Sequence, residues 1–317
     1  MNSPLPVGFE WRRPGRDDAE AIFGVIGRHN TPLVGSPDIT LAEVADELTE
    51  PGFDPDHDAW LVRDAAGVDV AYGWAFRKGS SDLVDIAIFT DDTMADWLWA
   101  QVLGRARALG AAVGHDAITV TVDMYQNDDA QRDRARARGF APVTTFQRMR
   151  IDFDGPQPEP VVPAGVVVRT GPGDEAFRRE AHAVSTRAFV GQFGYVKRSF
   201  EEWHGSIDAA TTSDWGQVRV AYLDGEPVAM VRGSNQFVDD EACGYVATVA
   251  VLPEARGQGL AKLLLLQAFV DDHRRGRRGT VLHVDANNVT PALGLYRSVG
   301  MRPVLAIDVW QGRSPTG

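Results

Sequence analysis

The sequence predicts a protein of the α/β class, built as two tandem domains that each combine helices with a mixed sheet in an α+β arrangement. One observation behind this is that the predicted order of elements, βααβββαβαβ, occurs twice along the chain, and such repetition indicates a duplicated domain. The other is a proline-rich segment over residues 152–164, which suits an extended linker. We therefore expect one domain over residues 1–151 and a second over residues 165–317.

A repeat of single residues supports the duplication. Asn127 precedes Gly139 by the same number of positions that separates Asn288 from Gly300. Each glycine is followed by a hydrophobic residue and leads through a proline into a predicted last strand. The two halves therefore share a pattern of residues as well as an order of elements.

The second half shows its elements most clearly, with strand-like apolar runs and helix-like spacing of apolar residues. Asp174 is the predicted N-cap of its first helix. The expected strands are 166–170, 218–223, 227–233, 245–251, 280–285 and 304–309, and the expected helices are 174–189, 199–207, 257–272 and 291–298.

The first half repeats the same order with weaker patterns. Its expected strands are 9–12, 60–62, 70–76, 83–89, 118–122 and 143–149, and its expected helices are 17–28, 41–48, 94–109 and 129–136.

Composition and charge exclude several classes of function. With 44% hydrophobic and 24% charged residues, the chain is typical of an ordinary globular protein. Its net charge of −12 argues against a nucleic-acid partner and weakly favours a cationic substrate, although acidity also keeps a protein in solution. Neither a signal peptide nor a run of about 18 apolar residues is present, so we expect a cytoplasmic protein with no membrane partner. The single cysteine, Cys243, excludes an internal disulfide, and we expect it to be a buried hydrophobe rather than a nucleophile.

A glycine-rich turn in the second half is the strongest chemical signal. The predicted strand 245–251 leads into Arg256-Gly257-Gln258-Gly259-Leu260-Ala261 and then into a helix. A helix N-terminus offers free N–H groups and the positive end of the helix dipole, and glycines let a ligand approach the main chain. This junction predicts an anion site, and a diphosphate is its natural ligand.

The turn resembles the cofactor motif of the GNAT superfamily of acetyltransferases, which has the form Q/R-x-x-G-x-G/A and is matched by Arg256, Gly259 and Ala261. The family's second signature is a helix with Asn, Ala and Leu-Tyr that ends in Gly-Phe or Gly-Met. The residues that match it here are Asn288, Ala292, Leu295, Tyr296, Gly300 and Met301. The resemblance implies a CoA-dependent N-acetyltransferase that needs no metal ion.

The resemblance also implies which residues hold acetyl-CoA as co-substrate. The pantetheine arm pairs with the strand at 249–251, where a backbone N–H polarises the thioester carbonyl. The implied cofactor-binding residues are Val249, Ala250, Val251, Arg256, Gly257, Gln258, Gly259, Leu260, Ala261, Lys262, Asn288 and Tyr296.

Tyr296 and Tyr245 are the candidate catalytic residues. Family members use a tyrosine at the position of Tyr296 to protonate the leaving CoA thiolate, while packing of its helix is the alternative role. Many members carry a glutamate base on the strand where this chain has Tyr245. Its loss implies an acceptor amine of low pKa, or proton loss through ordered water. Tyr245 and His283 are candidate relay or substrate-binding residues, with a structural role as the alternative.

The first half lacks the cofactor motif. When the preceding strands are aligned, the residues Thr93, Met94, Asp96 and Leu98 replace Arg256, Gly257, Gly259 and Ala261, and Ala135 replaces Tyr296. A carboxylate and bulky side chains would exclude a diphosphate. We expect a degenerate domain that binds no CoA and forms one wall of the acceptor pocket. Trp97 and Trp99 are expected at that interface or in the core of their own domain.

One catalytic and one degenerate copy resemble the mycothiol synthase branch of the superfamily, in which the C-terminal domain acetylates the cysteine amine of a cysteinyl-glucosaminyl-inositol. The content of Ala, Arg and Asp is also typical of an actinobacterial protein. Tyr245 departs from this branch, and tandem members that modify antibiotics share its layout. The expected acceptor is therefore the primary amine of a small polar metabolite, of the mycothiol, antibiotic, amino-sugar or amino-acid type.

Two other functions fit the same fold. An acyl-CoA decarboxylase or hydrolase would not need a base for an amine, and a non-catalytic CoA-binding module would have lost the chemistry altogether. The protein is expected to be a monomer or a homodimer.

Overall fold

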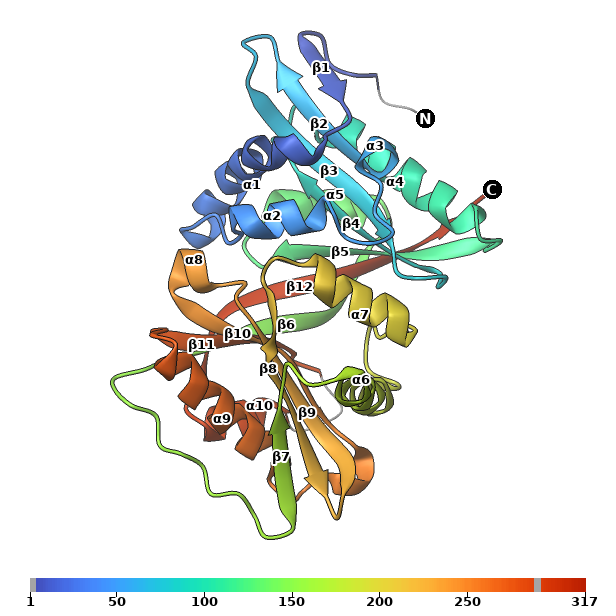
Figure 1. The fold of residues 1–317 in the computed structure, drawn as a ribbon. Helices are drawn as coiled ribbons and strands as arrows, with labels where there is room; N and C mark the ends of the chain where they lie inside the picture. The colour runs from blue at the N-terminus through green and yellow to red at the C-terminus, as the bar shows by residue number, and fades with distance from the viewer. Residues whose placement is uncertain (1–3, 288–291) are drawn as a thin grey trace. The chain divides into compact units, whose positions relative to one another are not determined.

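The computed structural model describes residues 4–287 and 292–317, which form two compact units. Unit 1 comprises Met1–Thr145 and Ile307–Gly317, and unit 2 comprises Phe146–Ala306. Each unit has a mixed sheet with helices, as Figure 1 shows, so the predicted fold class is confirmed.

Unit 1 is built on the strand order β1-β2-β3-β4-β5-β12, in which only the pair β4–β5 is parallel among the described pairings. The strands are β1 (Phe9–Arg12), β2 (Ala59–Asp64), β3 (Asp69–Arg77), β4 (Leu83–Phe89), β5 (Ala117–Tyr125) and β12 (Arg302–Pro315). The helices are η1 (Arg16–Asp18), α1 (Ala19–Val34), α2 (Leu41–Glu47), α3 (Pro55–Asp58), α4 (Ala95–Ala111) and α5 (Asp129–Ala137).

Unit 2 repeats this arrangement with the order β6-β11-β10-β9-β8-β7, in which β10 and β11 are the parallel pair. The strands are β6 (Ala141–Asp152), β7 (Val166–Thr170), β8 (Ser213–Leu223), β9 (Glu226–Ser234), β10 (Cys243–Val251) and β11 (Gly279–Asp285). The helices are α6 (Glu175–Phe189), α7 (Phe200–Ala209), α8 (Val238–Glu241), η2 (Pro253–Ala255), α9 (Leu260–Arg274) and α10 (Ala292–Ser298).

Each unit takes its last strand from the other half of the sequence. β6 pairs with β11 from Phe146 to Asp152, and β12 pairs with β5 from Ile307 to Pro315, both antiparallel. The compact units therefore divide the chain differently from the predicted boundaries at residues 151 and 165. Local sequence cannot select between the two partners, because pairing between distant strands is decided by the fold and both last strands carry similar patterns.

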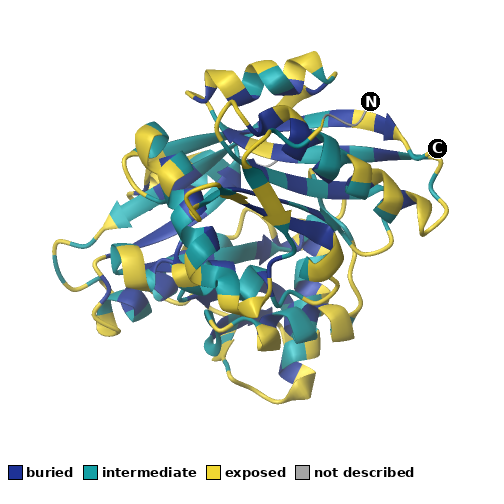
Figure 2. Cartoon of the chain, turned by 90° about the horizontal axis from the view of Figure 1, so that it is seen from above, coloured by how far each residue is buried: buried dark blue, intermediate teal, exposed yellow. Residues whose placement is uncertain are grey.

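The core of unit 2 lies on both faces of its sheet, and Figure 1 shows α6 and α7 on one side and α9 on the other. Leu264 and Phe269 of α9 pack against Leu282 and Val246 on one face. On the opposite face, apolar side chains of α6 and α7 pack with Val218, Val220 and Met230. Covered on both faces, β9 and β11 each contain a run of four buried residues. Figure 2 shows the burial along the strands, and a regular alternation of buried and more exposed residues occurs in β4 and β5 of unit 1.

In unit 1, Trp97 and Trp99 belong to the core formed by α4 against the sheet. Both are at most 5% exposed, so they take the core role rather than forming an exposed aromatic surface. Trp99 packs edge-on against Phe140, with ring centroids 5.6 Å apart.

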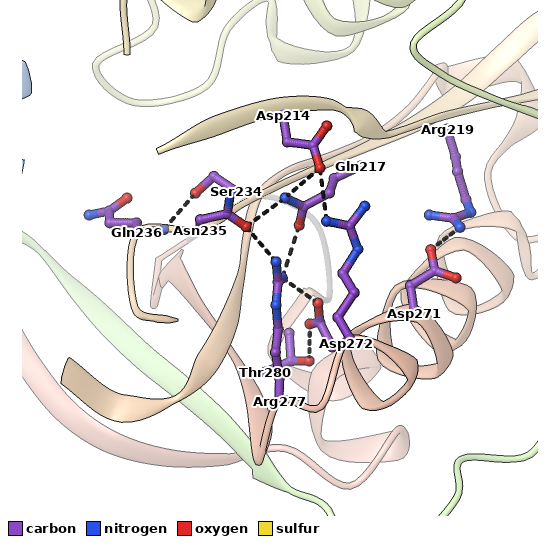
Figure 3. A network of polar contacts seen from close by, with 11 residues as sticks. Asp214, Gln217, Arg219, Ser234, Asn235, Gln236, Asp271, Asp272, Arg277 and Thr280 are labelled. Carbon is purple, nitrogen blue, oxygen red and sulfur yellow. Dashed lines mark hydrogen bonds and ion pairs between the residues drawn. The ribbon is translucent and has the colours of Figure 1, made fainter. Parts of the chain in front are cut away.

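A buried polar network closes the C-terminal end of α9, as Figure 3 shows. Arg277 Nη1 donates to Asp272 Oδ1 at 2.6 Å and to Gln217 Oε1 at 2.9 Å, and Thr280 Oγ1 donates to Asp272 Oδ2 at 2.5 Å. Gly244 is required here because a Cβ at that position would overlap the Asp272 carboxylate. Arg277 therefore serves the core of unit 2, in addition to the dipole role that its place after the helix suggests.

Candidate active site

The centre of the site is the place where two parallel strands of unit 2 separate. The described pairing of β10 with β11 covers only Cys243–Tyr245 with Gly279–Val281. Beyond it, β10 shifts its register against β9 between Val246 and Thr248, which marks a β-bulge. A cavity of about 560 Å³ lies at this opening and is lined by both strands, by the turn before α9 and by α10.

The cavity brings together most of the residues predicted to hold the cofactor. Those that line it are Val249, Ala250, Val251, Arg256, Gly257, Gly259, Leu260, Ala261, Lys262 and Tyr296. Gln258 is exposed and is not among the lining residues that the structure describes. Asn288 lies outside the described residues.

The glycine turn has the geometry of an anion site. Gly257 and Gly259 have φ angles of +79° and +78°, which only glycine adopts without strain, and a Cβ on either would meet open space. The helix begins at Leu260 instead of the predicted 257, because Gly259 in the left-handed conformation is its N-cap. The first N–H groups of α9 have no partner within the helix, and the helix dipole adds positive potential there.

Two cations flank the turn. Arg256 donates to the carbonyl of Val251 at 3.3 Å and to that of Ala188 at 3.5 Å, so its guanidinium also ties the turn to the end of α6. Lys262 lies exposed in the first turn of α9 and lines the cavity. Both can supply positive charge to a diphosphate.

Tyr296 reaches the cavity from α10 and is 8% exposed. Burial raises the pKa of its phenol to about 12, and the neighbouring Tyr245 acts in the same direction. The phenol is therefore protonated at neutral pH and can donate a hydrogen bond or a proton. It also packs with Val299 and Met301, so the catalytic and packing roles predicted for it are compatible.

Tyr245 and His283 form a pair at the other end of the cavity. The Tyr245 hydroxyl and His283 Nδ1 are 3.1 Å apart, and Phe237 packs edge-on against the Tyr245 ring at 5.2 Å. Burial lowers the pKa of His283 to about 4, and the positive charge of Arg148 adds to this. His283 is therefore neutral at pH 7, so one ring nitrogen can accept a hydrogen bond or a proton.

The depressed pKa of His283 makes stability depend on pH. The unfolded state takes up a proton near pH 6.5 and the folded state near pH 4, so stability is complete above pH 6.5 and falls as the pH is lowered toward 4. We expect a loss of up to about 3 kcal/mol across this window. Urea titrations at several pH values check this, and the His283→Gln variant should lack that part of the slope. An equal slope in the variant would contradict the assignment.

Other residues of the cavity were not predicted. They include the aromatic residues Phe146, Phe189 and Phe193, together with Gln192 and Asp285. Phe146 comes from β6, so only the exchange of last strands brings it here. Asp285 accepts a hydrogen bond from the Asn287 N–H at 2.9 Å and is the only carboxylate among the described lining residues. In the sequence, Asp285 ends a predicted strand just before the second GNAT signature, and this position could have indicated a residue of the site.

Cys243 is not a nucleophile in this structure. Its side chain is fully buried, and burial raises the pKa of the thiol to about 11. A protonated, inaccessible thiol is unreactive at neutral pH.

The corresponding opening in unit 1 is filled by side chains. β4 pairs in parallel with β5 from Leu83 to Ile86, as β10 does with β11. Beyond this point the Gln131 amide donates to the carbonyl of Ile88 at 2.9 Å and accepts from Trp99 Nε1 at 3.3 Å. Met94, which replaces the first glycine, is 1% exposed. That the first domain binds no CoA stays a prediction, and these contacts are consistent with it.

Two other kinds of site are absent from residues 4–287 and 292–317. No helix in these ranges is long and apolar enough to cross a membrane. No group of three or more metal-ligating side chains occurs there either.

The separated parallel strands, the glycine turn and the helix that follows are similar to those of the GNAT acetyltransferase class. Residues 186–301 match the acetyltransferase (GNAT) family profile. This range contains β10, the turn and α9, which form most of the cavity. The resemblance is thus confirmed, and with it the enzyme class of an acyltransferase, whose members use an acyl-CoA as co-substrate.

The particular relatives are mycothiol acetyltransferases of actinobacteria. The chain is 29% identical to the enzyme of Pseudarthrobacter chlorophenolicus over 78% of this chain and 74% of that one. It is 29% identical to the enzyme of Rhodococcus erythropolis over 73% of this chain and 78% of that one.

Solved structures share the tandem fold. A GCN5-related N-acetyltransferase from Sphaerobacter thermophilus superimposes with a TM-score of 0.80 at 24% identity, covering 99% of this chain and 97% of that chain. A tandem GNAT protein from the clavulanic acid biosynthesis pathway gives a TM-score of 0.69 at 17% identity, covering 98% and 99% of the two chains. These likenesses establish the fold of both units.

Proposed function

We propose that this enzyme transfers the acetyl group of acetyl-CoA directly to the primary amine of a small polar metabolite. The observation that carries the proposal is the cavity of unit 2, which has an anion site at one end and the side chains of Tyr296, Tyr245 and His283 along its walls. The names of the relatives support an acceptor of the mycothiol type. An antibiotic, an amino sugar or an amino acid is the alternative acceptor.

Acetyl-CoA, the acyl donor, would lie in the cavity in a single orientation. A diphosphate at the turn around Gly257 and Gly259 would lead the pantetheine arm along Val249–Val251 toward the bulge in β10. The backbone of β10 has N–H groups at this opening, and one of them can donate a hydrogen bond to the thioester carbonyl and so polarise it, as an oxyanion donor does. Positioning and polarisation together supply most of the rate in such a direct transfer.

The transfer requires a balanced movement of protons. The acceptor nitrogen forms a bond to the acyl carbon, the bond from that carbon to sulfur breaks, and the nitrogen loses a proton. Tyr296 stabilises the departing thiolate with its protonated phenol. Neutral His283, in contact with the Tyr245 hydroxyl, can receive the proton of the amine directly or through water.

The decisive experiment measures release of the free CoA thiol with acetyl-CoA and a panel of primary amines. The panel contains amino acids, amino sugars, aminoglycosides and a cysteinyl-glucosaminyl-inositol. Release that depends on both substrates, with an N-acetylated product in the mass spectrum, is the expected result. Release without any amine would favour a hydrolase, and binding of CoA with no turnover would favour a binding module; either result would reject the proposal.

A separate prediction concerns CoA binding at the glycine turn. Gly259→Asp is expected to weaken CoA binding by at least about 100-fold, because it strains a left-handed position and places a carboxylate beside the diphosphate. Gly276→Asp is the matched control, since Gly276 also has a φ of +78° and open space around its Cβ position but follows α9 at its far end. Calorimetric titration with CoA measures both. Equal weakening in the two variants would show that strain alone is responsible.

A further inference from the structure

Arg232, in the middle of the unit 2 sheet, has no partner among the residues that the structure describes. It lies on β9, with Val218 of β8 and Thr248 of β10 as its neighbours in register. Its Nε atom is buried and has no hydrogen-bond partner, and the side chain forms no ion pair with any residue that the structure describes. Thr248 follows the bulge and lines the cavity, and Arg232 is its register neighbour, although Arg232 is not itself among the described lining residues.

The side chain of Arg232 lies on the same face of the sheet as Tyr245 and His283. Gly244 faces Asp272 of α9, so the next residue, Tyr245, points to the opposite face. Met230 packs with the residues of α6 and α7 on that opposite face, and Arg232 follows two positions later. Ser234, two positions after Arg232 on β9, is the register partner of Tyr245, which places both side chains on one face.

Other enclosed arginines of this unit are paired, which distinguishes Arg232. Arg148 and Arg150 both contact Glu241, Arg277 pairs with Asp272, and Arg219 pairs with Asp271. An enclosed cation without a counter-ion is destabilising, since it loses hydration and gains no attraction in return. Burial lowers the pKa of Arg232, and the positive charge of Arg198 acts in the same direction. Arg232 as a whole is of intermediate exposure, so the unfavourable contribution comes from its buried Nε–H group, which has no hydrogen-bond partner.

An anion would remove that unfavourable contribution. The planar guanidinium donates two parallel hydrogen bonds to a carboxylate or phosphate, which gives affinity as well as orientation. An anion held by Arg232 would fix a substrate beside Thr248 and Tyr245, at the end of the cavity where the acyl carbon is expected.

We propose that the acceptor carries a carboxylate or phosphate group close to its amine, and that Arg232 binds this group and sets the specificity for it. The inference rests on the proposed acetyl transfer. Among the proposed acceptors it favours an amino acid or another zwitterionic or phosphorylated amine over a cysteinyl-glucosaminyl-inositol, whose cysteine carboxyl is part of an amide. It departs from the cationic substrate that the net charge of −12 weakly favoured, because the charge near the site differs from that of the whole chain.

Matched pairs of amines test the specificity. L-serine is compared with L-serinamide, and phosphoethanolamine with ethanolamine, by kcat/KM for CoA release. The wild-type enzyme is expected to prefer the anionic member of at least one pair by about 10-fold or more, and the pair that shows it identifies carboxylate or phosphate. Because the amide has the lower amine pKa, intrinsic reactivity would favour it instead. Equal use of both members, or preference for the neutral ones, would overturn the inference while leaving acetyl transfer intact.

Variants of Arg232 connect the preference to this residue. Arg232→Gln should lower kcat/KM for the anionic member by about 10- to 100-fold and leave the neutral member nearly unchanged. Arg179→Gln is the control, because it removes the same charge from an exposed residue of α6 that pairs with Glu175. A preference that survives in Arg232→Gln would reject the role of this residue.

Thermal unfolding tests the inference even if no amine in the panel is acetylated. Because Arg232 has no partner, Arg232→Gln should unfold at the same temperature as the wild-type protein or higher, whereas a structural arginine would lower it. Inorganic phosphate, added to protein saturated with CoA, should raise the unfolding temperature of the wild type but not of the variant. A variant that is clearly less stable, or a phosphate effect equal in both proteins, would contradict an anion site at Arg232.

Discussion

Replacing Tyr296 by phenylalanine is expected to lower kcat for acetyl transfer by about 100-fold and to leave the affinity for CoA nearly unchanged. The phenol is protonated at neutral pH because burial raises its pKa to about 12. It lies in the cavity wall, where the ring itself packs with Val299 and Met301. Phenylalanine keeps that packing and removes only the hydroxyl, so the loss should fall on the step in which the thiolate departs. Steady-state kinetics with a saturating amine, together with CoA titration, measure the two effects separately.

Tyr222→Phe is the matched control for this prediction. Tyr222 is 7% exposed, burial raises its pKa to about 12, and its hydroxyl donates to Glu180 on a part of unit 2 outside the cavity. It should keep nearly full activity. If Tyr296→Phe retains wild-type kcat, then Tyr296 serves packing alone, which is the alternative role that its helix spacing suggested.

The elements of the fold were accessible to sequence reasoning because their patterns are local. β1, β4 and β7 begin and end at the predicted residues, and Asp174 caps α6 as expected, accepting from the Phe177 N–H at 2.9 Å. The short helices α3 and α8 were missed, since four residues carry too little periodicity. The beginning of α9 was placed too early because two left-handed glycines look like the first turn of a helix in sequence.

The site was only partly accessible, since much of it depends on pairing between distant strands. The glycine turn is contiguous in sequence and could be recognised from its residues. Arg232 and Thr248 become neighbours only through the register of β9 with β10, and Phe146 reaches the cavity only through the exchange of last strands. No local pattern specifies either relation. A long-range pairing of this kind has to be seen in the structure.

The two units show how one arrangement of strands can be kept with or without a binding site. In unit 2 the opening between the parallel strands remains a cavity, with open space beside Gly257 and Gly259. In unit 1 the same opening is occupied by Gln131, whose amide bonds to the carbonyl of Ile88. A buried strand carbonyl needs a partner, and the glutamine supplies it where a cofactor would otherwise lie. The first half therefore lacks the glycine motif and has, in its place, a glutamine side chain that bonds to the strand carbonyl.

Replacing Arg277 by glutamine is expected to lower the free energy of unfolding by about 3–5 kcal/mol, measured by urea titration. Arg277 and Asp272 are 8% and 5% exposed, and burial raises the pKa of Asp272 despite its contacts with Thr280 and Arg277. The pair is therefore costly to bury, and removal of the cation leaves an uncompensated carboxylate against Gly244. The variant is less stable because the buried Asp272 carboxylate remains without its cation. The loss can therefore be large even if the intact ion pair stabilises the protein only weakly.

Two further variants separate this explanation from a general loss of charge. Arg274→Gln removes an arginine from the same helix end whose pair with Glu159 is exposed, and it should change the free energy of unfolding by less than about 1 kcal/mol. The double variant Arg277→Gln with Asp272→Asn should recover part of the loss, since no charge is then left unpaired. If the double variant is as unstable as the sum of the two single variants, the pair is not coupled. The polar network would then stabilise unit 2 through its separate hydrogen bonds to Gln217 and Thr280.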